Sequence, residues 1–183
     1  KRQLLGWVWA ADRGTTSRIR AVSAQPGGQE RIVTATWLRP GERIVDLRLS
    51  RSGAQAAMLV DDGQRTTLRV SGVVRGSDGV PNALTEPILL PSSGSEDSVE
   101  WAGDTNLLVS AYAEKPDERV VPRIVSIDGT VRELNPLGGL RGISAGDDGA
   151  YYAETEEFVF LLVGSSWRAQ ELDRGVRDLS FPD

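Results

Sequence analysis

The stretch "IVDLRLSRSGAQAAMLV", residues 44–60, constrains the fold more than any other feature of this chain. Apolar and polar residues alternate from Ile44, a Ser-Gly pair interrupts the run, and a second apolar run follows. Alternation with a period of two is typical of a half-buried β-strand, and a short polar break between two such runs is typical of a hairpin. A hairpin pattern that returns along the chain would indicate a repeat architecture.

The pattern does return, in "DSVEWAGDTNLLVSAY", "LRGISAGDDGAYYAE" and "VRDLSFPD". The matching apolar positions, which are separated by 52, 44 and 36 residues, are Leu47, Val99, Ile143 and Leu179. A four-stranded propeller blade takes about 40 to 50 residues. The spacing therefore predicts an all-β propeller built of four-stranded antiparallel blades, either incomplete or closed by a C-terminal strand.

We expect a single propeller domain or arc over residues 1–183. Its predicted blades are, approximately, 1–39 (partial), 40–93, 94–138 and 139–173, followed by a closing strand at 174–183. Strands of the first complete blade are predicted at Ile44–Leu49, Gln55–Val60, Thr67–Val74 and Ala83–Leu90. The partial blade supplies three strands and lacks its first, which "VRDLSFPD" would provide, because propellers commonly close by pairing strands from the two termini.

Four Asp-Gly pairs mark tight turns: Asp62-Gly63, Asp78-Gly79, Asp128-Gly129 and Asp148-Gly149. Both residue types tolerate the positive φ that hairpin turns require. Each pair is therefore predicted to join two strands of one blade.

Composition excludes several function classes. The chain has no His, which removes the commonest general base and zinc ligand, and no Cys, so it has no disulfide framework. The net charge is −5, and the basic residues are spread along the chain rather than clustered, which argues against nucleic-acid binding. No apolar run approaches the roughly 20 residues that span a bilayer. The chain lacks an initiating Met, so we expect a piece of a longer protein with any targeting segment upstream.

The repeats resemble the C-terminal β-propeller domain of the LpqB-family lipoproteins of actinobacteria. The resemblance rests on "RIVDLRLSRSGAQAAMLV", "LRVSGVVRGSDGVPNALTEP", "VEWAGDTNLLV", "VSIDGTV", "LRGISAGDDG", "GSSWRAQ" and "SFPD", which together cover nearly all of the chain from Gly6 onward.

This resemblance implies an extracytoplasmic protein that is lipid-anchored at a segment upstream of this chain, with a GerMN-type domain ahead of the propeller. It also implies a partner, the extracellular part of the MtrB sensor kinase, and a role in modulating MtrA–MtrB signalling linked to cell-wall homeostasis and division. The resemblance supplies no set of catalytic or binding residues, and we expect no cofactor and no catalysis.

Two groups of acidic residues are candidate sites. Asp61-Asp62-Gly63 and Asp147-Asp148-Gly149 offer oxygen ligands for Ca²⁺ but lack the further spaced carboxylates of a calcium loop, so turns are the preferred interpretation. A carboxylate pair for glycoside hydrolysis would need a separation of about 5 to 10 Å. The candidates for that pair, for which solvated strand edges are preferred, are Asp97, Glu100, Glu154, Glu156 and Glu157.

The tryptophans allow two interpretations. Trp7 and Trp9 lie two residues apart on one strand and so share a face, where they would stack on a sugar or partner or, as we prefer, pack between blades. Trp37, Trp101 and Trp167 fall at or near strand ends and are predicted to seal the interfaces between blades.

The longest polar insertions are Pro91–Ser98 and Ala113–Pro122. Loops that project from a rigid scaffold commonly carry binding function, although flexible solvent loops are the simpler interpretation. We expect a non-catalytic interaction domain whose loop surfaces meet a protein partner. The alternatives are a carbohydrate-binding or carbohydrate-active propeller of the cell envelope, and a structural spacer.

Overall fold

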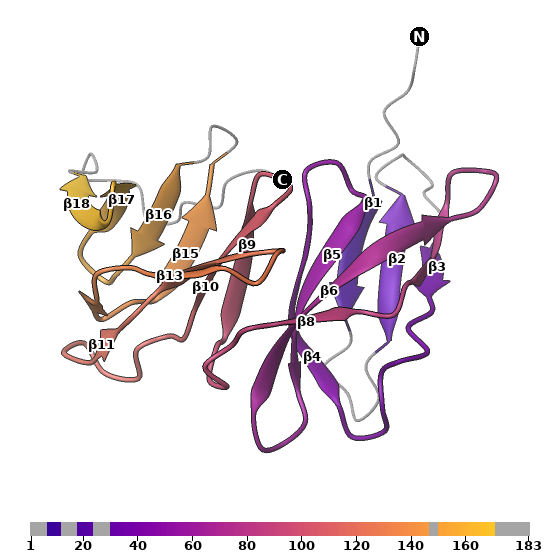
Figure 1. Ribbon diagram of the computed structural model, residues 1–183, viewed down its shortest axis with the longest axis horizontal. Helices are drawn as coiled ribbons and strands as arrows, with labels where there is room; N and C mark the ends of the chain where they lie inside the picture. Colours follow the sequence, from indigo (N-terminus) through magenta and orange to yellow (C-terminus); the bar gives the residue numbers. More distant parts are fainter. Residues whose placement is uncertain (1–6, 12–17, 24–29, 147–149, 171–183) are drawn as a thin grey trace, which may run out of the picture.

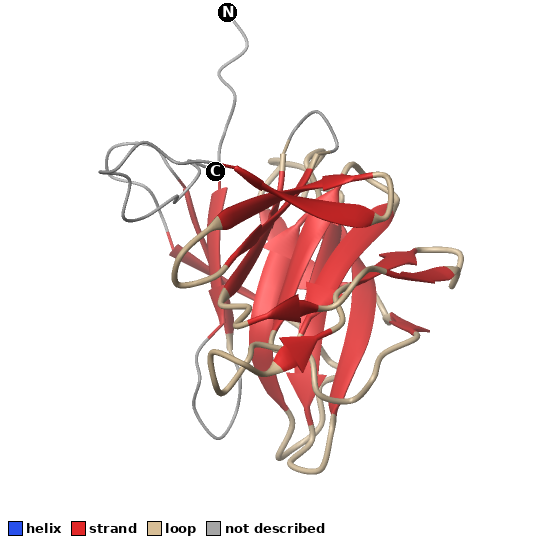
Figure 2. Ribbon diagram, turned by 90° about the vertical axis from the view of Figure 1, so that its left-hand side faces the viewer, coloured by secondary structure: helices blue, strands red, loops and turns tan. Residues whose placement is uncertain are grey.

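The computed structural model describes residues 7–11, 18–23, 30–146 and 150–170. Within these ranges every regular element is a β-strand (Figure 2), which confirms the all-β prediction. The described segments contain no helix with the length and apolarity to cross a membrane.

Two antiparallel sheets come from the first half of the chain. The first has the order β1-β2-β3 and consists of β1 (Trp7–Ala11), β2 (Ile19–Ser23) and β3 (Glu30–Val33). The second has the order β4-β5-β6-β7, with a further strand β8 on β6, and consists of β4 (Arg43–Leu49), β5 (Gln55–Asp61), β6 (Thr66–Arg75), β7 (Pro81–Leu84) and β8 (Ile88–Leu90).

Two four-stranded antiparallel sheets follow. The third sheet consists of β9 (Ser98–Ala102), β10 (Asn106–Ser110), β12 (Arg123–Ser126) and β13 (Val131–Glu133). The fourth consists of β15 (Gly142–Ala145), β16 (Tyr151–Glu154), β17 (Val159–Val163) and β18 (Ser166–Gln170). A two-stranded ribbon between them pairs β11 (Arg119–Val120) with β14 (Leu137–Gly138).

The sheets stack side by side, from β1–β3 at the right of Figure 1 to β15–β18 at the left. The first strands of successive sheets lie next to one another, since β1 contacts β4, β4 contacts β9 and β9 contacts β15. Each sheet is a meander that leads away from this shared row. This is the arrangement of propeller blades around an axis.

Three hydrophobic layers fill the spaces between the sheets. Side chains of β5 alternate between two of these layers. Ala56, Met58 and Val60 face the first sheet, while Ala57 and Leu59 face the third. All five side chains are fully buried. A strand that is apolar on both faces needs a covering sheet on each side, and the stacking provides both.

Strand β10 repeats this alternation. Leu107 and Val109 pack toward the second sheet, whereas Leu108 packs toward the fourth. The repeat positions predicted from the sequence are equivalent in space: Leu47, Val99 and Ile143 lie on the first strands of their sheets and each packs toward the preceding sheet. The fourth position, Leu179, lies outside the described residues.

Three of the four predicted Asp-Gly turns are confirmed. Gly63, Gly79 and Gly129 have φ of 88°, 77° and 89°, and they join β5 to β6, β6 to β7 and β12 to β13. The aspartates hold the turns through their side chains. For example, Asp128 Oδ1 accepts a hydrogen bond from the Thr130 N–H at 2.9 Å. Asp148-Gly149 lies outside the described residues.

The prediction of one strand over Ala83–Leu90 is wrong, because β7 ends at Leu84 and β8 begins at Ile88. Pro87 lies in the gap and cannot donate a ladder hydrogen bond, so the fourth position of this sheet is shared by two short strands that both pair with β6. The β11–β14 ribbon was not predicted. The proposed closing strand lies outside the described residues, so ring closure stays a prediction.

A buried ion pair fastens the connection between the first two sheets to β6. Glu42 Oε1 accepts a hydrogen bond from Arg69 Nη2 at 2.6 Å, and Glu42 Oε2 accepts one from Arg69 Nη1 at 3.1 Å. The Arg69 guanidinium lies 5.5 Å from the centre of the Trp37 ring, and the Arg39 N–H donates to Glu42 at 2.9 Å. The hydrogen bonds from Arg69 lower the pKa of Glu42 against the opposing effect of burial.

We predict that Glu42→Gln destabilises the fold by about 3 kcal/mol at neutral pH, because it leaves the buried Arg69 charge uncompensated. Since the pKa of Glu42 is lower in the folded chain than its ordinary 4.5, the stabilisation is complete above that value and is lost as pH falls through the folded value. Urea unfolding across acidic pH measures both effects.

The matched control is Glu30→Gln, which removes an exposed ion pair with Arg20 whose side chains are 41% and 50% accessible. We expect this control to change the free energy of unfolding by less than about 1 kcal/mol. If Glu42→Gln and Glu30→Gln lowered the free energy of unfolding equally, the buried pair would stabilise the fold no more than the exposed one.

Candidate functional site

The two polar insertions meet at one end of β9 and β10. Asp97 precedes β9 and donates its backbone N–H to the Ser110 carbonyl at 2.9 Å, while Asp97 Oδ2 accepts the backbone N–H of Tyr112 at 3.1 Å. Tyr112 follows β10 and immediately precedes the second insertion. These bonds fix Asp97 and Tyr112 next to each other.

A β-bulge in β4 turns the facing side chains toward this pair. Ile44 pairs with Val60, but the next pair is Asp46 with Leu59, so Val45 is an extra residue. The bulge shifts the alternation: Ile44 and Leu47 both pack toward the first sheet although they are three residues apart, which strict alternation would place on opposite faces. Val45 and Asp46 consequently both face the third sheet.

A polar seam joins β4 to β9. Asp46 Oδ2 accepts the Val99 N–H at 3.0 Å, and its Oδ1 lies 3.1 Å from Arg48 Nη1. Arg48 in turn donates from Nε to Glu100 at 2.8 Å, and its carbonyl accepts the Trp101 indole N–H at 3.0 Å. Arg48 and Glu100 are 52 residues apart, which is the period read from the sequence, and the other two pairs are 53 apart. Equivalent positions of neighbouring repeats, or positions one residue away from equivalence, therefore contact each other.

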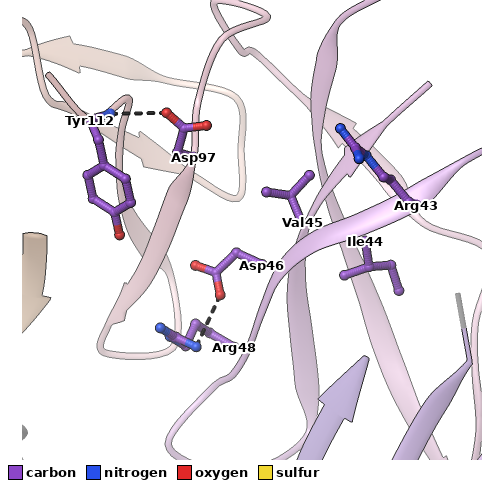
Figure 3. Close-up of a pocket in the computed structure, with 7 residues that line it drawn as sticks. All are labelled: Arg43, Ile44, Val45, Asp46, Arg48, Asp97 and Tyr112. Carbon is purple, nitrogen blue, oxygen red and sulfur yellow. Dashed lines mark hydrogen bonds and ion pairs between the residues drawn. The ribbon is translucent and has the colours of Figure 1, made fainter. Parts of the chain in front are cut away.

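An open cavity of 520 Å³ lies between β4 and the Asp97–Tyr112 pair, and we call it the Tyr112 cavity. Its lining residues, shown in Figure 3, are Arg43, Ile44, Val45, Asp46, Arg48, Asp97 and Tyr112. The figure shows Asp97 and Tyr112 on one side and the β4 residues on the other, with Asp46 and Arg48 paired below. The cavity therefore spans the junction of the second and third sheets.

Charge and burial both shift the pKa values of two groups that line the cavity, Tyr112 and Arg48. Burial raises the pKa of Tyr112, and the carboxylates of Asp46 and Asp97 add to this, whereas a hydrogen bond with Ser98 and the charge of Arg48 oppose it. Burial alone would lower the pKa of Arg48, but the neighbouring carboxylates of Asp46 and Glu100 reverse the direction and raise it. The guanidinium of Arg48 therefore stays charged.

A second cavity of 310 Å³ is lined by residues of both insertions and by Arg123 of β12 and Glu133 of β13. Glu96, which is 1% exposed, accepts backbone N–H groups of Ser93 at 2.6 Å and Gly94 at 3.1 Å and forms an ion pair with Arg123. Burial lowers the pKa of Arg123, while the charge of Glu133 opposes that change. Because Glu96 accepts hydrogen bonds from its own loop and forms an ion pair with Arg123 of β12, it holds the first insertion on the third sheet.

The carboxylates considered for glycoside hydrolysis fall in two places. Asp97 and Glu100 belong to the start of the third sheet, whereas the end of β16 and the turn after it carry Glu154, Glu156 and Glu157. Glu100 pairs with Arg48, and Glu156 pairs with Arg141 at 2.9 Å. Of the five, Asp97 lines the Tyr112 cavity.

The Asp61-Asp62-Gly63 segment forms a turn, as preferred from the sequence. Asp61 accepts the Gly63 N–H at 2.8 Å and pairs with Arg43, while Asp62 accepts the N–H groups of Gln64 and Arg65. These backbone hydrogen bonds lower the pKa of both carboxyls. No cluster of three or more potential metal ligands occurs within residues 7–11, 18–23, 30–146 and 150–170, and Asp147-Asp148-Gly149 lies outside them.

The tryptophans occupy the interfaces between sheets, as predicted. Trp37 lies between the first and second sheets, Trp101 between the second and third, and Trp167 between the third and fourth. Trp9 is partly buried and packs at the first of these interfaces, which agrees with core packing. The side chain of Trp7 lies outside the described part of the chain.

A family model described as the lipoprotein LpqB beta-propeller domain matches residues 2–182. The chain belongs to this family. The match agrees with the stacked antiparallel sheets and confirms the propeller fold class. No match was found among curated proteins.

Solved structures share the fold of this LpqB-type propeller. They include a protein proposed to be a 6-phosphogluconolactonase from Bacteroides uniformis, with a TM-score of 0.54 and 13% identity over 89% of this chain. A puromycin-hydrolysing peptidase from Mycobacterium tuberculosis matches with a TM-score of 0.54 and 16% identity over 91% of the chain. The chain spans 50% of the first structure and 32% of the second, and at these identities the likeness shows the fold alone.

Sequence reasoning missed the β4 side of the cavity. The sequence does contain a signal for the contact between Arg48 and Glu100. The 52-residue repeat places these two residues at equivalent positions of adjacent blades, and their charges are opposite. The bulge at Val45 had no such signal. Tyr112 was also missed, since it adjoins a predicted loop without belonging to a motif.

We predict that Asp97→Asn lowers the pKa of Tyr112, because the negative carboxylate disfavours the phenolate, while burial keeps the pKa above its ordinary 10.0. Spectrophotometric titration of the phenols measures the change, and subtracting the curve of Tyr112→Phe isolates this residue. An unchanged or higher pKa in Asp97→Asn would show that the carboxylate does not act on the ring.

Proposed function

We propose that this LpqB-type propeller is a non-catalytic interaction domain that binds the extracellular part of the MtrB sensor kinase and thereby modulates MtrA–MtrB signalling, with consequences for cell-wall homeostasis and division. Membership of a lipoprotein family supports a location outside the cytoplasmic membrane, with the propeller attached through a lipid on the longer protein. The partner and the pathway follow from the resemblance of the sequence to the actinobacterial proteins.

The main support for the proposal is that three side chains suited to a protein interface, Tyr112, Arg43 and Arg48, lie together at the Tyr112 cavity. Tyr112 is 39% exposed, and the side chains of Arg43 and Arg48 are 62% and 45% exposed. Tyrosine and arginine are enriched among the residues that dominate binding energy at protein interfaces. Here they are held on strand ends by ion pairs and backbone hydrogen bonds, so little conformational freedom is lost when a partner docks.

A carbohydrate ligand is the second candidate, and one observation favours it. An aromatic ring beside a carboxylate in an open polar cavity, as at Tyr112 and Asp97, also suits stacking and hydrogen bonding with a sugar. Soluble cell-wall glycans added as competitors distinguish the two candidates.

We predict that the chain binds immobilised MtrB extracellular domain and that Tyr112→Ala weakens this binding about tenfold or more, as measured by biolayer interferometry. The matched control is Phe158→Ala, which removes an aromatic side chain of similar exposure, 46%, from the turn between β16 and β17. We expect the control to bind like the unaltered chain.

Absence of binding by the unaltered chain would overturn the proposed function. Equal losses in Tyr112→Ala and Phe158→Ala would remove the Tyr112 cavity from the interface. Capture of the chain by cell-wall glycans, with no capture by the kinase domain, would favour the carbohydrate alternative.

A further inference from the structure

Both arginines that line the Tyr112 cavity are already paired with carboxylates. Arg43 is committed to Asp61, with Nη2 at 2.6 Å and Nε at 2.8 Å from the same carboxylate oxygen. Arg48 is shared between two carboxylates, Asp46 at 3.1 Å and Glu100 at 2.8 Å. The lining itself holds two guanidinium groups and two carboxylates, Asp46 and Asp97, and neither guanidinium is paired with Asp97.

Asp97 is the lining carboxylate that neither arginine neutralises. Its Oδ2 accepts the Tyr112 N–H, and it takes part in none of the ion pairs formed within the described residues. An ionised carboxylate has about four acceptor positions, so capacity remains for donors from outside. The loop holds this group in place through two backbone hydrogen bonds, one from the Asp97 N–H and one to its side chain.

The Tyr112 ring provides the second half of a cation site. Figure 3 shows the ring next to Asp97, with its hydroxyl directed toward the β4 side of the cavity. The face of an aromatic ring attracts a cation, and a carboxylate beside the ring strengthens that attraction. Burial is the main cause of the raised pKa of Tyr112, and the charges of Asp46 and Asp97 add to it while that of Arg48 opposes it.

We propose that the Tyr112 cavity binds a basic side chain of the partner, with its guanidinium or ammonium group held by Asp97 and the Tyr112 ring. The inference rests on the proposed function, since it names the chemistry that the partner presents. The volume of 520 Å³ and the apolar wall formed by Val45 accommodate the long aliphatic stem of such a side chain. The net charge of −5 favours the approach of a basic segment over an acidic one.

The test is an NMR titration of the whole chain with the capped peptide acetyl-Gly-Arg-Gly-amide. We expect saturable shifts of the Tyr112 backbone amide, which donates to Asp97. The same peptide with citrulline, a neutral group of nearly the same shape, should bind at least about tenfold more weakly, as should the peptide with Glu.

The decisive variant is Asp97→Asn, which retains an oxygen to accept the Tyr112 N–H and is expected to weaken binding of the arginine peptide about tenfold. Its matched control is Asp78→Asn, because Asp78 likewise accepts a backbone N–H, from Val80 at 3.0 Å, but lies in the turn between β6 and β7. The control should bind the peptide like the unaltered chain.

Equal binding of arginine and citrulline peptides, or unchanged binding by Asp97→Asn, would overturn the inference. These outcomes are distinct from failure of the proposed function. If the arginine peptide binds in an Asp97-dependent way but the kinase domain does not, the basic-ligand site stands and the kinase is the wrong partner. If the kinase domain binds equally to Asp97→Asn and to the unaltered chain, the inference fails while the proposed function stands.

Discussion

Strand β5 is apolar on both faces, and the rest of the structure depends on covering both. Met58 and Leu59, adjacent in the chain, are fully buried in two different layers, one against the first sheet and one against the third. Burying a side chain of this size contributes roughly 1.5 to 3 kcal/mol, so neither layer is dispensable for a chain without disulfides. Strand β10 imposes the same requirement on its own neighbours. Two sheets packed face to face would leave one side of each strand in water, whereas a row of sheets covers both sides of the sheets that lie inside the row.

The same stacking positions the candidate site. Because the first strands lie side by side, polar groups of β4 reach β9, and the bulge at Val45 directs Asp46 and Arg48 into that contact. The seam they form is held by hydrogen bonds and ion pairs, and it ends next to the first polar insertion. Binding groups at the Tyr112 cavity are consequently held by a strand end on one side and by a hydrogen-bonded loop on the other. A surface of this kind suits recognition of a partner, since its side chains are ordered before the partner arrives.

More of the fold than of the candidate site could be predicted from the sequence. The equivalence of Leu47, Val99 and Ile143 and the turns at Asp62-Gly63 and Asp128-Gly129 depend on local alternation and backbone preference, which single segments reveal. The division of the predicted strand at Pro87 also has a local signal, because proline cannot donate a ladder hydrogen bond. The bulge at Val45 and the approach of Tyr112 to β4 depend instead on register between distant segments. Such contacts arise only when the sheets are stacked, so the cavity could not be read from the chain.

Native-state hydrogen exchange tests the stacking most directly, with Leu107→Ala as the perturbation. Leu107 is fully buried on β10 and belongs to the layer that also contains Ala57 and Leu59 of β5, so its truncation should cost about 2 to 5 kcal/mol. We expect faster exchange of β5 amides in the variant, although β5 belongs to another sheet, because the two sheets share one layer. Faster exchange confined to β10 and its own sheet, with β5 unchanged, would contradict the stacked arrangement.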